Sequence, residues 1–246
     1  MAPQQSPDTS EQSRTQSKID WYGNAPSEGF TFHWLPFLIA AGYLLSQWDT
    51  INWTFYLCLV IVVLIHETGH VVTGLATGCA IQRMQVFFFS FIDYKPRGLS
   101  SGKWSGITWS LGVLPWGGYI QFRTIPESPA KRLLISAGGI LFNLLTFGVL
   151  LILGRSGLIS VSTGIAAVLN GVLSLSLVLA VLNILPVYPL DGGAMLIHFI
   201  EMATGKGPSP KLLKTLSYIG FGLIIIFFFI YTDWVAHLMK SIMSLL

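Results

Sequence analysis

Long apolar runs separated by short polar connections dominate the chain. A transmembrane helix needs about 20 mainly apolar residues to cross the hydrocarbon core of a bilayer. Runs near this length cover approximately Phe32–Trp48, Trp53–Thr77, Arg132–Leu153, Val161–Leu185 and Leu212–Tyr231. The pattern therefore predicts an α-helical polytopic membrane protein with about five transmembrane helices.

The two ends of the chain differ from these runs. Residues 1–31 are rich in Ser, Gln, Pro and Thr and contain no apolar run, which predicts a disordered tail rather than a signal peptide. Near the other end, His237 and Lys240 lie on an otherwise apolar stretch, a pattern typical of a helix in the membrane interface. We therefore expect one membrane domain over residues 32–231 and an amphipathic C-terminal helix over residues 232–246.

The segment over residues 79–130 is β-branched and aromatic. Ile81–Tyr94 and Ile107–Phe122 are separated by a Gly/Ser/Lys stretch, which predicts short strands in a small membrane-associated β-hairpin or sheet. Pro115–Tyr119 is expected to form a turn or bend within the second strand. Two interpretations remain open: the hairpin only packs at the interface, or its edge holds an extended substrate segment by strand addition.

Composition agrees with a membrane location. The 246 residues are 52% hydrophobic and 10% charged, against about 25% charged residues in soluble domains. The net charge of +3 is small, so nucleic acid is not an expected partner. This composition therefore predicts that the lipid bilayer is the environment of the protein.

The positions of the basic residues predict an orientation. Five spans place the N-terminal tail, the segment after the second span and the segment after the fourth span on one side. With the helix-boundary residues Arg132 and Lys214 included, that side carries twelve of the 14 Lys and Arg residues. The positive-inside rule then places the N-terminus in the cytoplasm and the C-terminus outside.

One motif in the second apolar run carries candidate chemistry. It is His66-Glu67-Thr68-Gly69-His70. On a helix, positions i and i+4 share one face, so the two histidines can reach a single ion. The adjacent Glu67 matches the general base in the H-E-x-x-H pattern of zinc hydrolases. Ionisable residues inside an apolar span are costly, and they are functional by default.

A catalytic zinc ion usually has three protein ligands and one open position. Candidates for the third ligand are Asp93, Asp191, His198 and Glu201. Asp191 follows Pro186 and Pro189, which break the helix, so we expect it on a non-helical stretch at the depth of the histidines. His198 and Glu201 are expected on a surface helix over about Ala194–Thr204, where they would be solvated. The geometry therefore favours Asp191.

The expected chemistry assigns further roles. One zinc ion lowers the pKa of a bound water, and Glu67 accepts the proton of that water. Asn183 lies on the same helix break and is a candidate to hold the substrate, although capping the helix end explains it as well. Asn143 is a weaker candidate, because hydrogen bonding between helices explains it at least as well.

Together these motifs resemble the site-2 protease family of intramembrane zinc metalloproteases. The resemblance spans about residues 60–195, within an expected catalytic core of about 50–200. The matching motifs are His66-Glu67-Thr68-Gly69-His70, Pro115-x-Gly117-Gly118-Tyr119, Gly139-x-x-x-Asn143, and Asn183-x-x-Pro186-x-x-Pro189-Leu190-Asp191-Gly192-Gly193. The first and last motifs are highly specific, and the middle two are not.

The resemblance implies that zinc is held by His66, His70 and Asp191, that Glu67 is the base, and that Asn183 contacts substrate. The implied substrate is a membrane-spanning helix of another protein, cut within or near the bilayer. Family members often have Pro and His or Arg where this chain has Ile140 and Ala194. Neither is an expected ligand, so these departures concern gating or substrate handling. The length leaves no room for a PDZ or CBS domain, so we expect a compact form.

Two alternatives belong to other functional classes. A transporter or sensor that binds zinc without hydrolysis would have ionisable groups along several spans, whereas here they cluster at one depth and Glu67 would have no evident role. An inactive membrane scaffold is disfavoured because no residue of the expected site is missing. The compact length weakly favours a prokaryotic cell membrane as the location.

Overall fold

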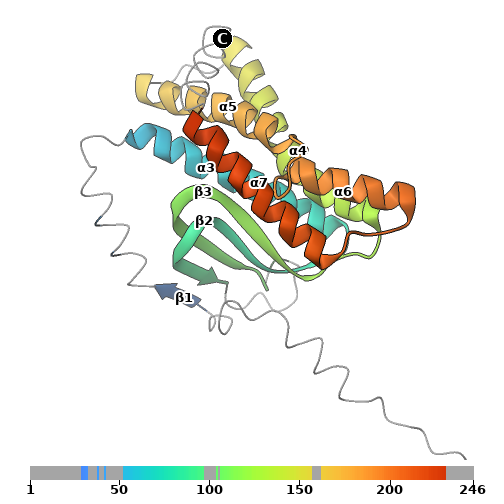
Figure 1. Cartoon of the computed structure of the whole chain (residues 1–246). Coiled ribbons are helices and arrows are strands. Elements are labelled where there is room, and N and C mark those ends of the chain that lie inside the picture. The colour runs from blue at the N-terminus through green and yellow to red at the C-terminus, as the bar shows by residue number, and fades with distance from the viewer. Residues whose placement is uncertain are drawn as a thin grey trace, which may run out of the picture.

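The structure is a computed structural model that describes residues 29–32, 38, 42, 52–96, 104, 106–156 and 162–230. Five long helices and three strands make up this part of the chain (Figure 1). The elements are β1 Gly29–Phe32, α3 Trp53–Ala76, β2 Ala80–Lys95, β3 Thr108–Thr124, α4 Pro129–Ser156, α5 Thr163–Asn183, α6 Asp191–Thr204 and α7 Pro210–Ile230. The fold is mostly helical with one small sheet, as the sequence predicts.

Three of the described helices, α3, α4 and α5, are long and apolar enough to cross a membrane. Their surfaces support this: Leu145 and Ile152 on α4 are 62% and 69% exposed. Large apolar side chains exposed in such numbers need a partner other than water. The first predicted span lies outside the described residues except for Leu38 and Gly42, and α7 coincides with the fifth. The total of five spans stays a prediction.

Helix α3 has well-defined ends. The Asn52 side chain accepts a hydrogen bond from the backbone N–H of Phe55 at 3.0 Å, which caps the first turn. At the other end Gly78 has a φ of +94°, a conformation that glycine adopts without steric cost. The chain then enters β2. The two predicted strand segments are thus confirmed as strands, each slightly longer than expected.

The sheet pairs β1 with β2 and β2 with β3, in antiparallel fashion. Gly29 to Phe32 pair with Lys95 to Ile92. The last residues of the predicted tail over 1–31 therefore form an edge strand, because the exposed polar groups of β2 offer them backbone partners. Residues 1–28 and the predicted helix over 232–246 lie outside the described part of the chain.

Strand β2 bends so that both of its halves pair with β3. Met84 pairs with Trp109 and Ile120, and Tyr94 also pairs with Trp109. The bend contains Phe87 and Phe89, whose φ values of 66° and 56° are unusual for bulky side chains. The start of β3 therefore lies between the two halves of β2. Within the described residues, the end of β3 pairs on one side only and forms a sheet edge.

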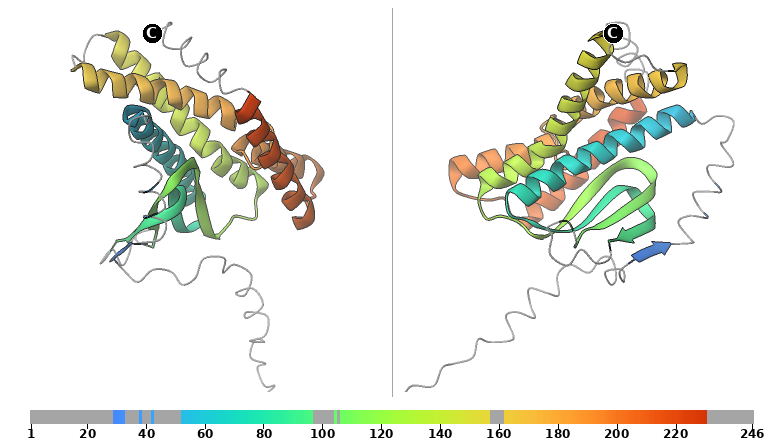
Figure 2. Two further views of the ribbon diagram at one scale, coloured as in Figure 1. Left: turned by 60° about the vertical axis from the view of Figure 1, so that its left-hand side comes forward. Right: turned by 180° about the vertical axis from the view of Figure 1, so that it is seen from behind.

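The core places α3 between the sheet and α5 (Figures 1 and 2). On one side, buried residues of α3 such as Val71 pack against Met84 and Phe87 of β2. On the other, Val62 packs against Leu175 of α5. The part of α3 that carries the polar motif thus lies within the protein, which is the environment that a buried polar motif requires.

The non-helical segment after α5 ends at Asp191, the residue that the sequence favours as the third metal ligand. Residues 184–190 are non-helical, and α6 begins at Asp191 rather than near Ala194. The prediction that Asp191 lies on the non-helical stretch is wrong by one residue, because Gly192 and Gly193 let the new helix start directly against the preceding turn. A side chain on either glycine would overlap the backbone of Ile184 or Tyr188.

Candidate metal centre

Helix α3 brings the two histidines of the motif side by side, with their rings in an edge-to-face arrangement. Their Nε2 atoms lie 3.2 Å apart, as the spacing of four residues on a helix predicts. Both residues are buried, with His66 6% and His70 8% exposed. The helical geometry thus aims two potential ligand atoms at one point inside the protein.

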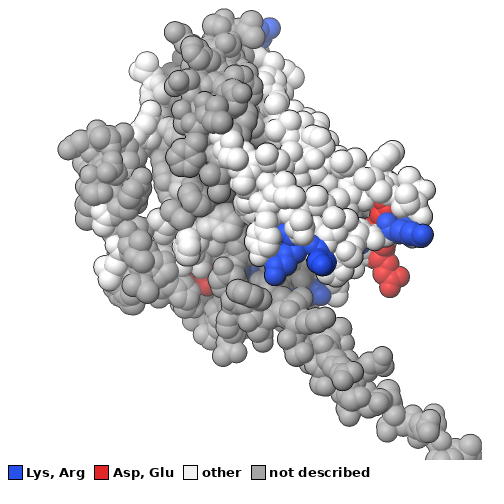
Figure 3. Space-filling view, in the orientation of Figure 1, with Lys and Arg blue, Asp and Glu red and all other residues white. Residues whose placement is uncertain are grey.

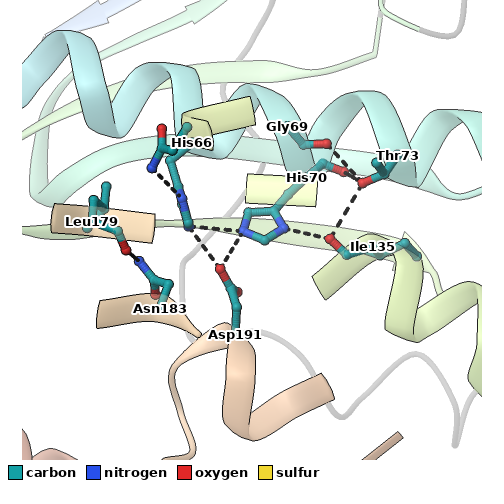
Figure 4. Close-up of polar contacts among 9 residues, drawn as sticks. His66, Gly69, His70, Thr73, Ile135, Leu179, Asn183 and Asp191 are labelled. Carbon is teal, nitrogen blue, oxygen red and sulfur yellow. Dashed lines mark hydrogen bonds and ion pairs between the residues drawn. The ribbon is translucent and has the colours of Figure 1, made fainter. Parts of the chain in front are cut away.

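Asp191 reaches this point from the start of α6. Its Oδ2 atom lies 3.0 Å from Nε2 of His66 and 3.3 Å from Nε2 of His70. Figure 4 shows the three side chains converging from two elements far apart in the sequence. One ligand atom from each residue lies within 4.8 Å of the others. The structure therefore assembles the three residues that the sequence proposes as metal ligands.

The donor set fits a divalent metal ion such as zinc. The carbonyl oxygen of Ile135 lies 2.7 Å from Nδ1 of His70, and a carbonyl can only accept, so Nδ1 carries the proton. The Nε2 lone pair of His70 then points to the cluster. Oδ2 of Asp191 is buried and receives no hydrogen bond from any described residue. Two nitrogens and one carboxylate oxygen are ligands typical of zinc.

Glycines let α4 approach this cluster closely. A methyl group added at Gly139 would lie 2.5 Å from Nε2 of His70 and 2.6 Å from Nε2 of His66. One added at Gly69 would overlap the carbonyl of Gly138. Small residues at helix contacts allow such close packing in membrane proteins. At Gly138 and Gly139, helix α4 therefore lies against the site with backbone atoms.

Glu67 lies on α3 between the histidines in sequence and is 5% exposed. Its carboxylate lies against β3, because a methyl group added at Gly118 would come within 2.8 Å of Oε1. The Pro115–Tyr119 motif, expected as a turn or bend within the second strand, lies in β3 where this strand bends, with Gly117 at a φ of +102°. The sheet thus meets the helical site at the proposed base.

Asn183 is the last residue of α5 and lies beside the cluster in Figure 4. Its Nδ2 donates to the carbonyl of Leu179 at 3.0 Å, one turn back on the same helix. This contact fits the interpretation of Asn183 as a residue that satisfies a backbone group at the helix end. The amide oxygen of Asn183 does not take part in this hydrogen bond. Asn143, the weaker candidate, is fully buried, and its Nδ2 lies 3.1 Å from Nδ1 of His66.

The other candidates for a third ligand lie elsewhere. Asp93 pairs with Arg83 at 2.9 Å in the sheet. Glu201 pairs with Arg132 at 2.6 Å, and His198 is half-buried beside this pair. The expectation that His198 and Glu201 are solvated is wrong, because α6 packs against the start of α4. Burial, together with the nearby Arg132 guanidinium, lowers the pKa of His198.

Sequence reasoning named Gly139 and Asn143 but did not predict that this face of α4 contacts the two histidines. Ile135, Gly139 and Asn143 recur every four residues and therefore share one helix face. All three contact the histidines or the space between them. The spacing was visible in the sequence, but nothing in it indicated which neighbour this face meets.

These features define a class of protein: a helical membrane protein with a small sheet and a buried His, His, Asp cluster able to hold a metal ion. The chain belongs to peptidase family M50, whose sequence profile matches residues 54–158 and 151–227. This match confirms the resemblance to site-2 proteases.

Individual relatives agree with this membership. The chain is 35% identical over 88 residues to a "Putative zinc metalloprotease" of Thermotoga maritima, covering 35% of this chain and 18% of that one. It is 34% identical over 65 residues to the "Probable protease eep" of Enterococcus faecalis, covering 26% and 15%. The matched segments thus span less than a fifth of these two relatives.

A solved structure has the same fold. It is the site-2 protease from Methanocaldococcus jannaschii, with a TM-score of 0.52 and 23% sequence identity. The match covers 83% of this chain and 80% of that one. At this identity the comparison supports the arrangement of helices and sheet, and the chemistry rests on the residues of this chain.

Proposed function

We propose that this chain is an intramembrane zinc metalloprotease that hydrolyses peptide bonds in or near the transmembrane segments of other membrane proteins. The observation that carries the proposal is the convergence of His66, His70 and Asp191 beside a buried Glu67, in a chain of peptidase family M50. In this proposal the three converging residues hold one zinc ion and Glu67 is the catalytic residue.

Bound zinc would supply a water molecule of lowered pKa and polarise the scissile carbonyl. Each chain residue has a matching task. The two imidazoles and the carboxylate of Asp191 present lone pairs to the ion. Glu67 takes a proton from the attacking water and passes it to the leaving amine. Burial of Glu67 against Gly118 excludes bulk water and fixes the carboxylate on the side of the sheet.

The sheet edge is the proposed place for the substrate backbone. The end of β3, from Gly118 to Thr124, pairs with β2 on one side among the described residues. A substrate segment that has unwound from its helix has free backbone N–H and C=O groups, which such an edge can satisfy by strand addition. Gly118 at the start of this edge contacts Glu67, so an added strand would lie beside the base. Asn183, with its amide oxygen, is proposed to contact the same segment.

The distribution of charge supports a membrane orientation with the site on the cytoplasmic side. Figure 3 shows a mostly uncharged helical surface, with basic side chains at the lower end of α7 and both basic and acidic side chains at the right-hand side, towards the end of α6. Lys211 and Lys214 in the first turns of α7 are exposed at that end. By the positive-inside rule this end faces the cytoplasm, as the sequence predicts. A prokaryotic cell membrane remains the proposed location.

Substitution of Glu67 by Gln tests the proposal. The variant keeps the size of the side chain and removes its ability to accept a proton. We expect cleavage of a single-span substrate, assayed in detergent with zinc present, to fall by about 10² to 10⁴-fold, while zinc content stays at the wild-type level. Glu127→Gln is the matched control, because Glu127 is exposed.

Undiminished cleavage by Glu67→Gln would refute the assignment of the base. A protein that binds zinc, cleaves no transmembrane substrate and moves zinc across sealed vesicles would replace the protease with a transporter. Absence of bound zinc in the purified wild type would refute the metal site.

A further inference from the structure

Helix α4 contacts Nδ1, the nitrogen turned away from the metal cluster, in each of the two proposed histidine ligands. Nδ1 of His70 lies 2.7 Å from the carbonyl oxygen of Ile135, and Nδ1 of His66 lies 3.1 Å from the Asn143 side-chain amide. Gly139, midway between these two residues, leaves room for both rings. One face of α4 thus contacts Nδ1 of both imidazoles. The contact to His70 comes from a backbone carbonyl, and the contact to His66 comes from a side-chain amide.

The backbone contact fixes the protonation of one ring. The Ile135 carbonyl accepts a hydrogen bond, so His70 carries its proton on Nδ1 and leaves Nε2 free for a metal ion. To bind the same metal ion through Nε2, the atom that lies 3.0 Å from Oδ2 of Asp191, His66 needs the same tautomer. Its partner on Nδ1 must therefore be an acceptor as well.

Asn143 can provide that acceptor. The nitrogen and oxygen of an amide have nearly the same shape, so the side chain fits with either atom towards His66. With Nδ2 towards the ring, Asn143 would donate to Nδ1, and Oδ1 is buried without a partner among the described residues. With the oxygen towards the ring, Oδ1 accepts a hydrogen bond from the Nδ1–H group of His66. The Nε2 lone pair of His66 then points at the cluster.

We infer that Asn143 is a positioning residue for the metal centre. Its side-chain oxygen accepts a hydrogen bond from Nδ1 of His66, selects the tautomer that binds metal through Nε2, and holds the ring in the plane that meets His70 and Asp191. Asn143 is fully buried, so no water competes for this bond. The inference rests on the proposed function to the extent that the cluster holds a metal ion.

Two variants distinguish a role of Asn143 as a hydrogen-bond acceptor from a role in packing alone. Asn143→Leu keeps the approximate shape and removes the acceptor, and Asn143→Asp keeps an acceptor oxygen and removes the amide nitrogen. Loss of such an outer hydrogen bond lowers metal affinity by about 10 to 100-fold. We expect this loss for Asn143→Leu and near wild-type affinity for Asn143→Asp, in zinc titrations of the full chain in detergent against a competing chelator.

Thr146→Val is the matched control on the same helix. The Thr146 hydroxyl is half-buried and donates only to the carbonyl of Phe142, within α4. Zinc affinity of this control should equal that of the wild type. Thermal unfolding of the metal-free proteins shows whether each variant folds.

Spectroscopy of the protein with Asn143 intact gives a second test that does not depend on the folding of the Asn143 variants. With ¹⁵N-labelled histidine, the metal-free wild type should show His66 protonated on Nδ1, assigned by the signal lost in His66→Gln. Protonation on Nε2 would overturn the inference, as would equal zinc affinity in Asn143→Leu and the wild type, or equal losses in both Asn143 variants. A wild type that binds no zinc would instead refute the proposed function.

Discussion

Two buried polar clusters in the described part of the chain are built in opposite ways. In the sheet, Arg83 donates to Asp93 at 2.9 Å and to Ser110 at 2.8 Å. In the helical region, Nε2 of His66, Nε2 of His70 and Oδ2 of Asp191 lie within 3.3 Å of one another. With both histidines protonated on Nδ1, as inferred above, all three atoms are acceptors. The first cluster matches donors with acceptors and positive charge with negative charge. The second gathers lone pairs and a negative charge without a matching donor among the described residues.

The difference indicates which cluster is structural. A buried ion pair whose hydrogen bonds are made within the protein needs nothing more, and it fixes how β2 folds on β3. A buried group of converging acceptors is costly unless a cation joins it. The helical cluster therefore has the composition of a binding site, and the sheet cluster has that of a fold-defining contact.

Removal of Asp191 should break the helical cluster most completely. Asp191→Ala deletes the only ligand that α6 provides to the cluster, leaving two imidazoles for the ion. We expect purified Asp191→Ala to contain no stoichiometric zinc, as measured by metal analysis, and to cleave no substrate. Removal of zinc from the wild type by a chelator should abolish activity in the same way, and re-addition of zinc should restore it. Full zinc content in the variant would contradict the assignment.

Substitution of Arg83 should damage the sheet cluster through the fold rather than the metal. Arg83→Met leaves the Asp93 carboxylate buried without its cation, which costs about 3 to 5 kcal/mol of unfolding free energy. The double variant Arg83→Met, Asp93→Leu should recover much of that loss. Thermal unfolding in detergent measures both. Zinc affinity of the folded fraction should not change, and a selective loss of zinc would contradict the contrast.

A larger side chain at Gly139 should press on both imidazoles. Overpacking of this kind costs about 1 to 3 kcal/mol, so Gly139→Ala should reduce both thermal stability and zinc affinity. Gly148→Ala on the same helix is the control, because a methyl group there would meet nothing within 4 Å. Equal behaviour of the two variants would show that α4 does not lie against the ligands.

A side chain at Gly118 should affect turnover without affecting metal content. Gly118→Ala would place a methyl group in overlap with the backbone oxygen of Gln85 and 2.8 Å from Oε1 of Glu67, so it would strain the pairing of β3 with β2 and displace the Glu67 carboxylate. We expect kcat to fall by about tenfold, because small misplacements of a reacting group are costly, with zinc content unchanged. Gly106→Ala, where the added carbon contacts nothing, is the control. A loss of zinc in Gly118→Ala would place this strand against the ligands instead.

The ion pair between α4 and α6 should have the smallest effect. Arg132 and Glu201 are only partly buried, with side chains 25% and 17% exposed. Pairs with access to solvent contribute about 0 to 1 kcal/mol, so Glu201→Gln should change the unfolding temperature little and leave zinc content intact. A large loss of zinc would mean that this pair positions α6, and with it Asp191.

Much of this arrangement could be predicted from local sequence patterns. The apolar runs that became α3, α4 and α5, the two strands, and the pairing of His66 with His70 depend on neighbours within a few residues. Such features follow from the period of a helix or a strand and from burial in lipid. Asp191 could be selected because prolines and glycines mark a break at the expected depth.

Contacts between distant segments were decided only by the tertiary structure. The packing of α4 made Ile135, Gly139 and Asn143 neighbours of the histidines, and the fold of β2 on β3 brought Gly118 to Glu67. It also buried Asp93 against Arg83 and partly buried Glu201 against Arg132, which removed two candidate ligands. Local periodicity says which face of an element is apolar or polar. Which other face it meets depends on how all elements pack together, and that information is spread over the whole chain.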